Sequence, residues 1–273
     1  MTKEKFIEVS PGIELSVKDA GSGDALVLIP GWTFGADVFH QQVEYFSKTH
    51  RVVAIDPRSQ GKSTISLQGN DYVTHARDVA KVLEELDLKN VTLLGWSFGC
   101  LTVWEYVRQF GLENVKKAVL VDLSPKPLSI DHKNDWVEGS LDDIAGAYTS
   151  SLRSPAGQRA FITEYATEVM VQRELDAAEL DWLVGESMKT PYYVAANLFA
   201  AGMFSDYRAE AERVNNSIPA LTVAAEHWGE TARAFMERTA PGSQLEILGG
   251  HLMFWEHPDR FNELLETFLN KEE

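Results

Sequence analysis

Gly95-Trp96-Ser97-Phe98-Gly99 stands between a short apolar run, residues 91–94, and a segment with apolar residues at helical spacing, 100–107. A serine between two glycines, at a turn from a buried strand into a helix, is typical of a nucleophile elbow. The turn is so tight that the positions two residues either side of the serine need small side chains. The following helix would point backbone N–H groups at whatever Ser97 attacks.

The same alternation of strand and helix continues on both sides of this motif. Apolar runs predict further buried strands at residues 25–29, 51–55, 118–121, 220–225 and 244–248. Helical spacing of apolar residues predicts helices at 38–46, at 71–86 and at the C-terminus, around 261–269. Strands that alternate with helices predict a mostly parallel sheet with helices on both faces.

Four motifs occur in a fixed order along the chain: Pro30-Gly31-Trp32, Asp56-Pro57-Arg58-x-x-Gly61-x-Ser63, the elbow, and Gly249-Gly250-His251. In this order, over nearly the whole chain, they resemble the α/β-hydrolase fold. The resemblance implies a fold of the α/β class, with a mostly parallel sheet of the eight-stranded type. The fold hosts esterases, lactonases, carbon–carbon bond hydrolases, haloperoxidases and cofactor-free dioxygenases, so it does not assign a substrate.

The stretch between residues 122 and 219 contains helix signals and no convincing strand. Helix starts are indicated at Ser140, at Ser154-Pro155, at Glu174 and at Pro191. The resemblance implies that such an insertion after the sixth strand is a helical cap. We therefore expect a core domain of residues 1–125 and 207–273 and a cap of residues 126–206, with some cap aromatics lining an apolar pocket over Ser97.

Ser97 is the candidate nucleophile, and a serine hydroxyl needs a base and an oxyanion stabiliser to react. His251 is the candidate base, because it follows Gly249-Gly250 on the loop where the family presents its catalytic histidine. His227, which follows the predicted strand 220–225, is the rival. The resemblance places the oxyanion hole at the backbone N–H groups of Trp32 and Phe98.

The third catalytic residue, an acid that would pair with His251, departs from the commoner family pattern. The family usually carries an aspartate a few residues after the strand that corresponds to 220–225, and here Trp228 stands at that position. The end of the preceding strand offers Asp122. Both strand ends lie at the same sheet edge, so a carboxylate from either can reach the far nitrogen of His251. We favour Asp122, with Glu226 and Glu230 as the alternatives.

Composition narrows the setting. A chain of 273 residues with 44% hydrophobic side chains can bury the core of one α/β domain. The net charge of −16 argues against nucleic acid or an anionic membrane as a partner and favours uncharged or apolar small-molecule substrates. The first residues show no apolar signal core, and the single cysteine suits a reducing compartment, so we expect a cytoplasmic location. A homodimer is left open.

We find no motif for a metal or a cofactor and expect neither. Asp56 stands where a phosphate loop would need glycine, and Cys100 is expected to pack rather than react. The sequence thus predicts a carboxylic ester hydrolase that cleaves an uncharged, apolar ester or lactone by a Ser97-His251-Asp122 acyl-enzyme mechanism. One alternative is a cofactor-free dioxygenase of a heteroaromatic, quinolone-like substrate with a His-Asp dyad. The other is a receptor or signalling homologue with little turnover.

Overall fold

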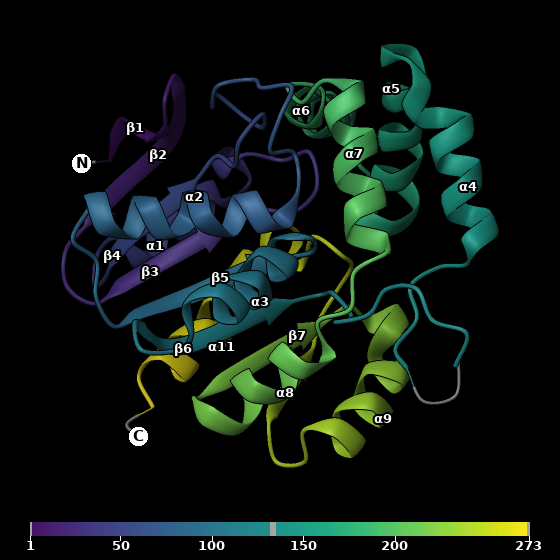
Figure 1. Cartoon of the computed structure of the whole chain (residues 1–273). Helices are drawn as coiled ribbons and strands as arrows, with labels where there is room; N and C mark the ends of the chain where they lie inside the picture. The colour runs from purple at the N-terminus through teal and green to yellow at the C-terminus, as the bar shows by residue number, and fades with distance from the viewer. Residues whose placement is uncertain (1, 132–134, 272–273) are drawn as a thin grey trace.

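Six apolar runs of the sequence and two N-terminal strands that were not predicted pair into one eight-stranded sheet in the computed structural model, which describes residues 2–131 and 135–271 (Figure 1). The strands are β1 Lys3–Ser10, β2 Ile13–Gly21, β3 Ala25–Ile29, β4 Arg51–Ile55, β5 Val91–Trp96, β6 Val115–Val121, β7 Ala220–Ala224 and β8 Gln244–Ile247. Their order is β1-β2-β4-β3-β5-β6-β7-β8, antiparallel from β1 to β4 and parallel from there on.

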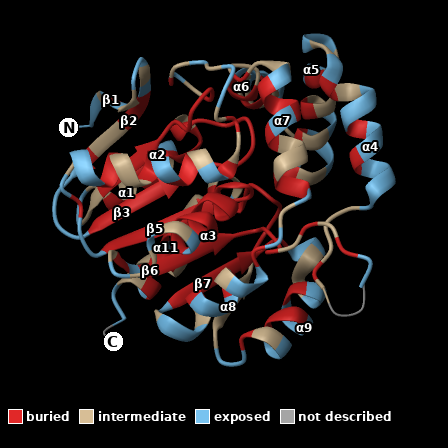
Figure 2. Cartoon of the chain, in the orientation of Figure 1, coloured by how far each residue is buried: buried red, intermediate tan, exposed pale blue. Residues whose placement is uncertain are grey.

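Both faces of the central strands are buried, which explains why they read as continuous apolar runs (Figure 2). In β3, Val27 and Ile29 pack into the apolar cluster on one face, and Leu26 and Leu28 into the cluster on the other. Each such side chain contributes about 1.5–3 kcal/mol when it is fully buried. The mostly parallel sheet with helices on both faces, predicted from the sequence, is confirmed.

Helices cover the two faces of the sheet. One face carries α2 Tyr72–Glu85, α3 Gly99–Phe110, α8 Arg208–Ser217 and α9 Gly229–Thr239, and the other carries α1 His40–Phe46, α10 Met253–Glu256 and α11 Pro258–Leu269 (Figure 1). Short 3₁₀ turns occur at η1 Ala36–Phe39 and η4 Glu226–Trp228. The Asp71 side chain accepts the Thr74 N–H and begins α2, one residue inside the predicted range.

Residues 126–206, called the cap segment below, contain helices from Leu141 onward and no strand among the residues described, and they cluster beyond the carboxyl ends of the strands (Figure 1). Residues 132–134 of this segment lie outside the described residues. Its elements are α4 Leu141–Thr149, η2 Ser151–Arg153, α5 Pro155–Tyr165, the π-helical turn η3 Ala166–Met170, α6 Ala177–Ser187 and α7 Tyr192–Met203.

The helix starts expected at Ser140, Ser154 and Pro191 are N-caps in the structure. The start expected at Glu174 is wrong. Helix α6 instead begins after Asp176, because the Asp176 and Glu179 side chains form a capping box. No helix in the described part of the chain is long and apolar enough to cross a membrane.

Candidate active site

The elbow forms as the sequence predicts. Strand β5 ends at Trp96, helix α3 begins at Gly99, and Ser97 between them has a left-handed backbone conformation with φ of 52°. A Cβ atom at Gly95 would lie 2.6 Å from the Cys100 nitrogen, and one at Gly99 would collide with the Ile29 carbonyl. Only glycine therefore fits at these two positions, and the turn holds Ser97 at the end of the central strand.

Asp122 and His251 meet beside this turn. Asp122 directly follows β6, and its Oδ2 lies 2.6 Å from His251 Nδ1. Its Oδ1 accepts the backbone N–H of Ala225 at 2.7 Å. The two side chains are buried, with residue exposures of 1% for Asp122 and 5% for His251. The contact orients the imidazole so that Nδ1–H points at the carboxylate and Nε2 is left as the proton acceptor.

The loop that carries His251 is held from two sides. The Trp96 indole donates a hydrogen bond to the His251 carbonyl at 2.8 Å. The backbone N–H groups of His251 and Leu252 donate to the carbonyls of Val169 and Met170 at 3.2 and 2.7 Å. Val169 and Met170 belong to η3, so the cap segment positions the histidine together with the sheet. No pattern in the sequence predicts this π-helical turn.

The alternative acids and the rival base lie elsewhere. Glu226 and Glu230 are exposed, and Glu226 accepts a hydrogen bond from the Gln172 amide at 3.1 Å. His227 is also exposed, on the turn after β7. Among these candidates, the geometry therefore supports Asp122 and His251 as the pair that serves Ser97.

Two backbone N–H groups are available as an oxyanion hole. Neither the Trp32 nor the Phe98 N–H has a hydrogen-bond acceptor among the described residues. The Trp32 loop passes very close to the elbow, since a Cβ atom on Gly31 would lie 2.7 Å from Ser97 Cβ. The Gln60 amide donates to the carbonyls of Gly31 and Phe34, at 3.2 and 2.7 Å, and so fixes this loop.

The Asp56-Pro57-Arg58 turn braces the same region. The Asp56 carboxylate accepts the N–H groups of Ala36 and Lys62, at 2.5 and 2.9 Å. Arg58 forms a buried, bidentate pair with Asp78 at 2.8 and 2.9 Å. These contacts keep the two loops beside the elbow in one arrangement.

Ser97 and His251 open into a cavity of about 240 Å³ between the sheet and the cap segment. Its walls are largely apolar and are formed by the following aromatic residues among others: Trp32, Trp96, Phe98, Phe161, Tyr165 and Phe199. The Trp32 indole also donates to the Ala195 carbonyl of α7 at 2.7 Å and so ties this wall to the cap segment. No lysine or arginine is among the described residues that line the cavity.

One charged residue of this cavity was not predicted. Glu138, which precedes α4, lines the cavity with Ser97 and His251, and its Oε1 accepts the backbone N–H of Ser124. Burial raises the pKa of this carboxyl to about 8, and the nearby Asp122 carboxylate adds to the rise. Glu138 is therefore mainly protonated at neutral pH.

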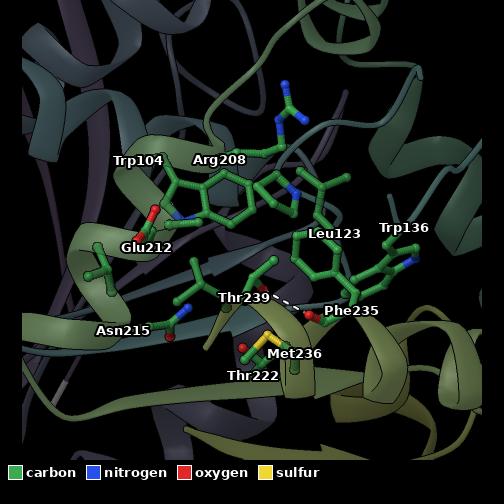
Figure 3. A pocket seen from close by; sticks show the side chains of 14 residues that line it. Trp104, Leu123, Trp136, Arg208, Glu212, Asn215, Thr222, Phe235, Met236 and Thr239 are labelled. Carbon is green, nitrogen blue, oxygen red and sulfur yellow. Dashed lines mark hydrogen bonds between the residues drawn. The ribbon is translucent and has the colours of Figure 1, made fainter. Parts of the chain in front are cut away.

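A second, smaller cavity of about 80 Å³ lies between α8, α9 and the sheet (Figure 3). Trp104, Leu123, Trp136, Phe235 and Met236 contribute apolar walls to it. None of the three candidate catalytic residues lines this cavity. The chemistry of the elbow therefore belongs to the larger cavity.

In the described residues, no group of three or more His, Cys, Asp or Glu side chains is placed to hold a metal ion. Cys100 is fully buried, and burial raises the pKa of its thiol. Its Sγ lies 3.1 Å from the Gly95 carbonyl, so it packs under the elbow.

Gly31→Ala is expected to lower kcat by about 100-fold, which is the usual cost of losing one oxyanion donor. The added Cβ would force apart the Trp32 loop and Ser97, because it would lie 2.7 Å from Ser97 Cβ. Steady-state hydrolysis of an ester measures the effect. Gly185→Ala is the matched control, since a Cβ at this exposed position of α6 meets nothing within 4 Å. Equal activity of the two variants would contradict the placement of the oxyanion hole.

Comparisons with known proteins agree with the fold. Residues 24–197 match the model of the α/β-hydrolase fold family. The chain is 30% identical to a putative non-heme chloroperoxidase from Synechocystis, over 96% of this chain and 97% of that protein. It is also 30% identical to the AB hydrolase superfamily protein YisY from Bacillus subtilis, over 97% and 98% of the two chains.

A third relative matches over a shorter stretch. The bifunctional esterase/perhydrolase DCH from Acinetobacter calcoaceticus is 35% identical over 46% of each chain. Among solved structures, a bromoperoxidase from Bacillus anthracis superposes with a TM-score of 0.89 at 23% identity, over 98% of this chain and all of that one. An esterase from Exiguobacterium antarcticum gives 0.86 at 24% identity, over 98% and 100%. These structural similarities support the fold alone.

Proposed function

The chain belongs to the α/β-hydrolase fold family, and on that basis we propose that it is a serine hydrolase of uncharged carboxylic esters or lactones. One observation carries the proposal: His251, which lies 2.6 Å from the buried Asp122 carboxylate, lines a largely apolar cavity together with Ser97. One relative named as an esterase/perhydrolase and one structural neighbour named as an esterase support ester hydrolysis as the reaction class. The absence of lysine and arginine from the described lining favours an uncharged substrate.

The reaction would run in two halves. His251 Nε2 takes the Ser97 proton while Oγ attacks the carbonyl carbon, and Asp122 stabilises the imidazolium that forms. The Trp32 and Phe98 N–H groups hold the oxyanion. His251 then protonates the leaving alkoxide, and the acyl group stays on Ser97. In the second half His251 deprotonates a water that attacks the acyl carbon, and the acid and free Ser97 are released.

A second candidate is perhydrolysis, which is favoured by the name of one relative, the bifunctional esterase/perhydrolase. Here hydrogen peroxide replaces water in the second half. It attacks the acyl carbon, its proton passes to His251, and a peroxycarboxylic acid leaves free Ser97. The same residues would carry both reactions, so the two differ only in the acyl acceptor.

The function is tested with a panel of p-nitrophenyl esters, lactones and a hydroxyquinolone, with and without hydrogen peroxide. Release of acid from esters or lactones is the expected result, and peracid formation in peroxide would add the second candidate. Oxygen uptake with the quinolone and no ester turnover would instead favour a dioxygenase. Labelling by a fluorophosphonate without turnover of any ester or lactone would favour a receptor-like protein.

A further inference from the structure

Glu138 reaches the active-site cavity although it lies outside the elbow, the histidine loop and the acid turn. Strand β6 ends just before Asp122, and an isolated β-bridge between Leu128 and Gly139 brings the chain back to the cavity. The Glu138 N–H also donates to the Pro127 carbonyl at 2.8 Å. These backbone contacts hold the Glu138 side chain at a wall that it shares with Ser97 and His251.

The Glu138 carboxyl group is only half satisfied. Its Oε1 accepts the Ser124 N–H, whereas no described residue forms a hydrogen bond or an ion pair with its Oε2. Glu138 is half-buried, and Oε2 is not among the buried side-chain atoms that lack a partner, so this oxygen is open to water or to a ligand. It is therefore available for a hydrogen bond to a molecule bound in the cavity.

Burial is the main cause of the raised Glu138 pKa, and the neighbouring Asp122 carboxylate adds to it. Asp122 lies near enough to disfavour a second negative charge, and Tyr165, Asp143 and His251 line the same cavity. No cation among the described residues pairs with it. A protonated carboxyl can donate through Oε2 while Oε1 still accepts from Ser124. The free oxygen is thus a hydrogen-bond donor at neutral pH.

We propose that Glu138 is a specificity-determining residue whose carboxyl donates a hydrogen bond to a second oxygen atom of a neutral substrate. This inference rests on the proposed function, since it assumes that the cavity binds an ester or lactone. The favoured substrates would then be oxygenated, with an ether, keto or hydroxyl oxygen in addition to the scissile group. Apolar side chains around Glu138 would take up the carbon chain.

Binding to the Ser97→Ala variant tests this inference without depending on turnover. Calorimetry compares ethyl hexanoate with analogues in which an oxygen replaces one methylene group at each position of the acyl or alkoxy chain. The best analogue is expected to bind about tenfold tighter than ethyl hexanoate, the value of one hydrogen bond. Adding Glu138→Gln should keep the preference, because an amide also donates and Oε1 remains an acceptor. Adding Glu138→Met should abolish it.

The same preference kept by the folded methionine variant, or no preference at any position, would overturn the inference. If the methionine variant fails to fold, the pH dependence decides. With Glu138 present, the preference should fall above pH 8, because the carboxyl loses the proton that it donates. With Glu138→Gln this fall should be absent, and any effect of His251, Asp122, Asp143 or Tyr165 should appear equally in both proteins. Equal pH profiles would overturn the inference.

A cationic ligand provides the opposite outcome. A carboxylate among aromatic rings would favour a quaternary ammonium group. Tighter binding of a choline ester than of its 3,3-dimethylbutyl isostere, lost in Glu138→Gln, would show an ionised Glu138 and overturn the inference. Wild-type protein that hydrolyses none of these esters would contradict the proposed function, while the binding data still decide the role of Glu138.

Discussion

Ser97→Ala is expected to lower kcat/KM for ester hydrolysis by about 10⁴-fold or more, with the fold preserved. The hydroxyl is the atom that forms the acyl bond, and the remaining oxyanion donors cannot replace it. Thermal unfolding checks the fold, and hydrolysis of one ester checks the rate. Alanine lacks only the hydroxyl oxygen of serine, so it fits at this buried position without a new contact.

Cys100→Ala is the matched control for this variant. Cys100 lies three residues further along the same turn and is the other nucleophile type at this site, but it is buried and its thiol pKa is raised. Its loss should leave hydrolysis within a few-fold of the wild type. Near-wild-type turnover by Ser97→Ala would contradict the acyl-enzyme mechanism and favour the His-Asp dioxygenase.

Asp122→Asn is expected to lower kcat by roughly 10³- to 10⁴-fold. Asparagine tolerates the left-handed backbone at this position, φ of 54°, and can still accept the Ala225 N–H, so the fold should remain. An amide cannot stabilise the imidazolium of His251, and it can favour the wrong tautomer. Steady-state rates with the same ester give the comparison.

Glu226→Gln and Glu230→Gln serve as controls for this acid. Both glutamates are exposed, so each variant should stay within a few-fold of the wild type. An active Asp122→Asn protein together with an inactive glutamate variant would place the acid after β7 instead.

Local patterns were enough to predict six of the eight strands and the elbow, whereas β1 and β2, which are not continuous apolar runs, were missed. Strands β3 and β4 have the predicted bounds, because the ends of an apolar run between polar turns indicate where a buried strand begins and ends. The elbow was predictable for a related reason: Gly95 and Gly99 are required by backbone atoms a few residues away or on the adjacent strand. Each of these patterns spans only a few residues, and tight packing leaves little choice of residue at those positions.

The acid could not be chosen with the same certainty, because two strand ends reach one histidine. The choice depends on how Asp122 turns at the end of β6 and on its hydrogen bond to Ala225, 103 residues away. Glu138 and Gln60 were missed for a similar reason. Gln60 acts through a loop 26 to 29 residues earlier, and Glu138 through the Ser124 N–H and the shared cavity wall, so neither leaves a local pattern.

Acid-quenched mass spectrometry of the protein mixed with a p-nitrophenyl ester tests most directly whether Ser97 forms an acyl-enzyme. The account predicts a mass increase equal to one acyl group, located by peptide mapping on Ser97. No such adduct is expected in Ser97→Ala. In His251→Ala the adduct should form much more slowly, because the base that activates Ser97 is missing. Continued hydrolysis by the wild-type protein with no acyl group on Ser97, or with the acyl group on another residue, would contradict the account.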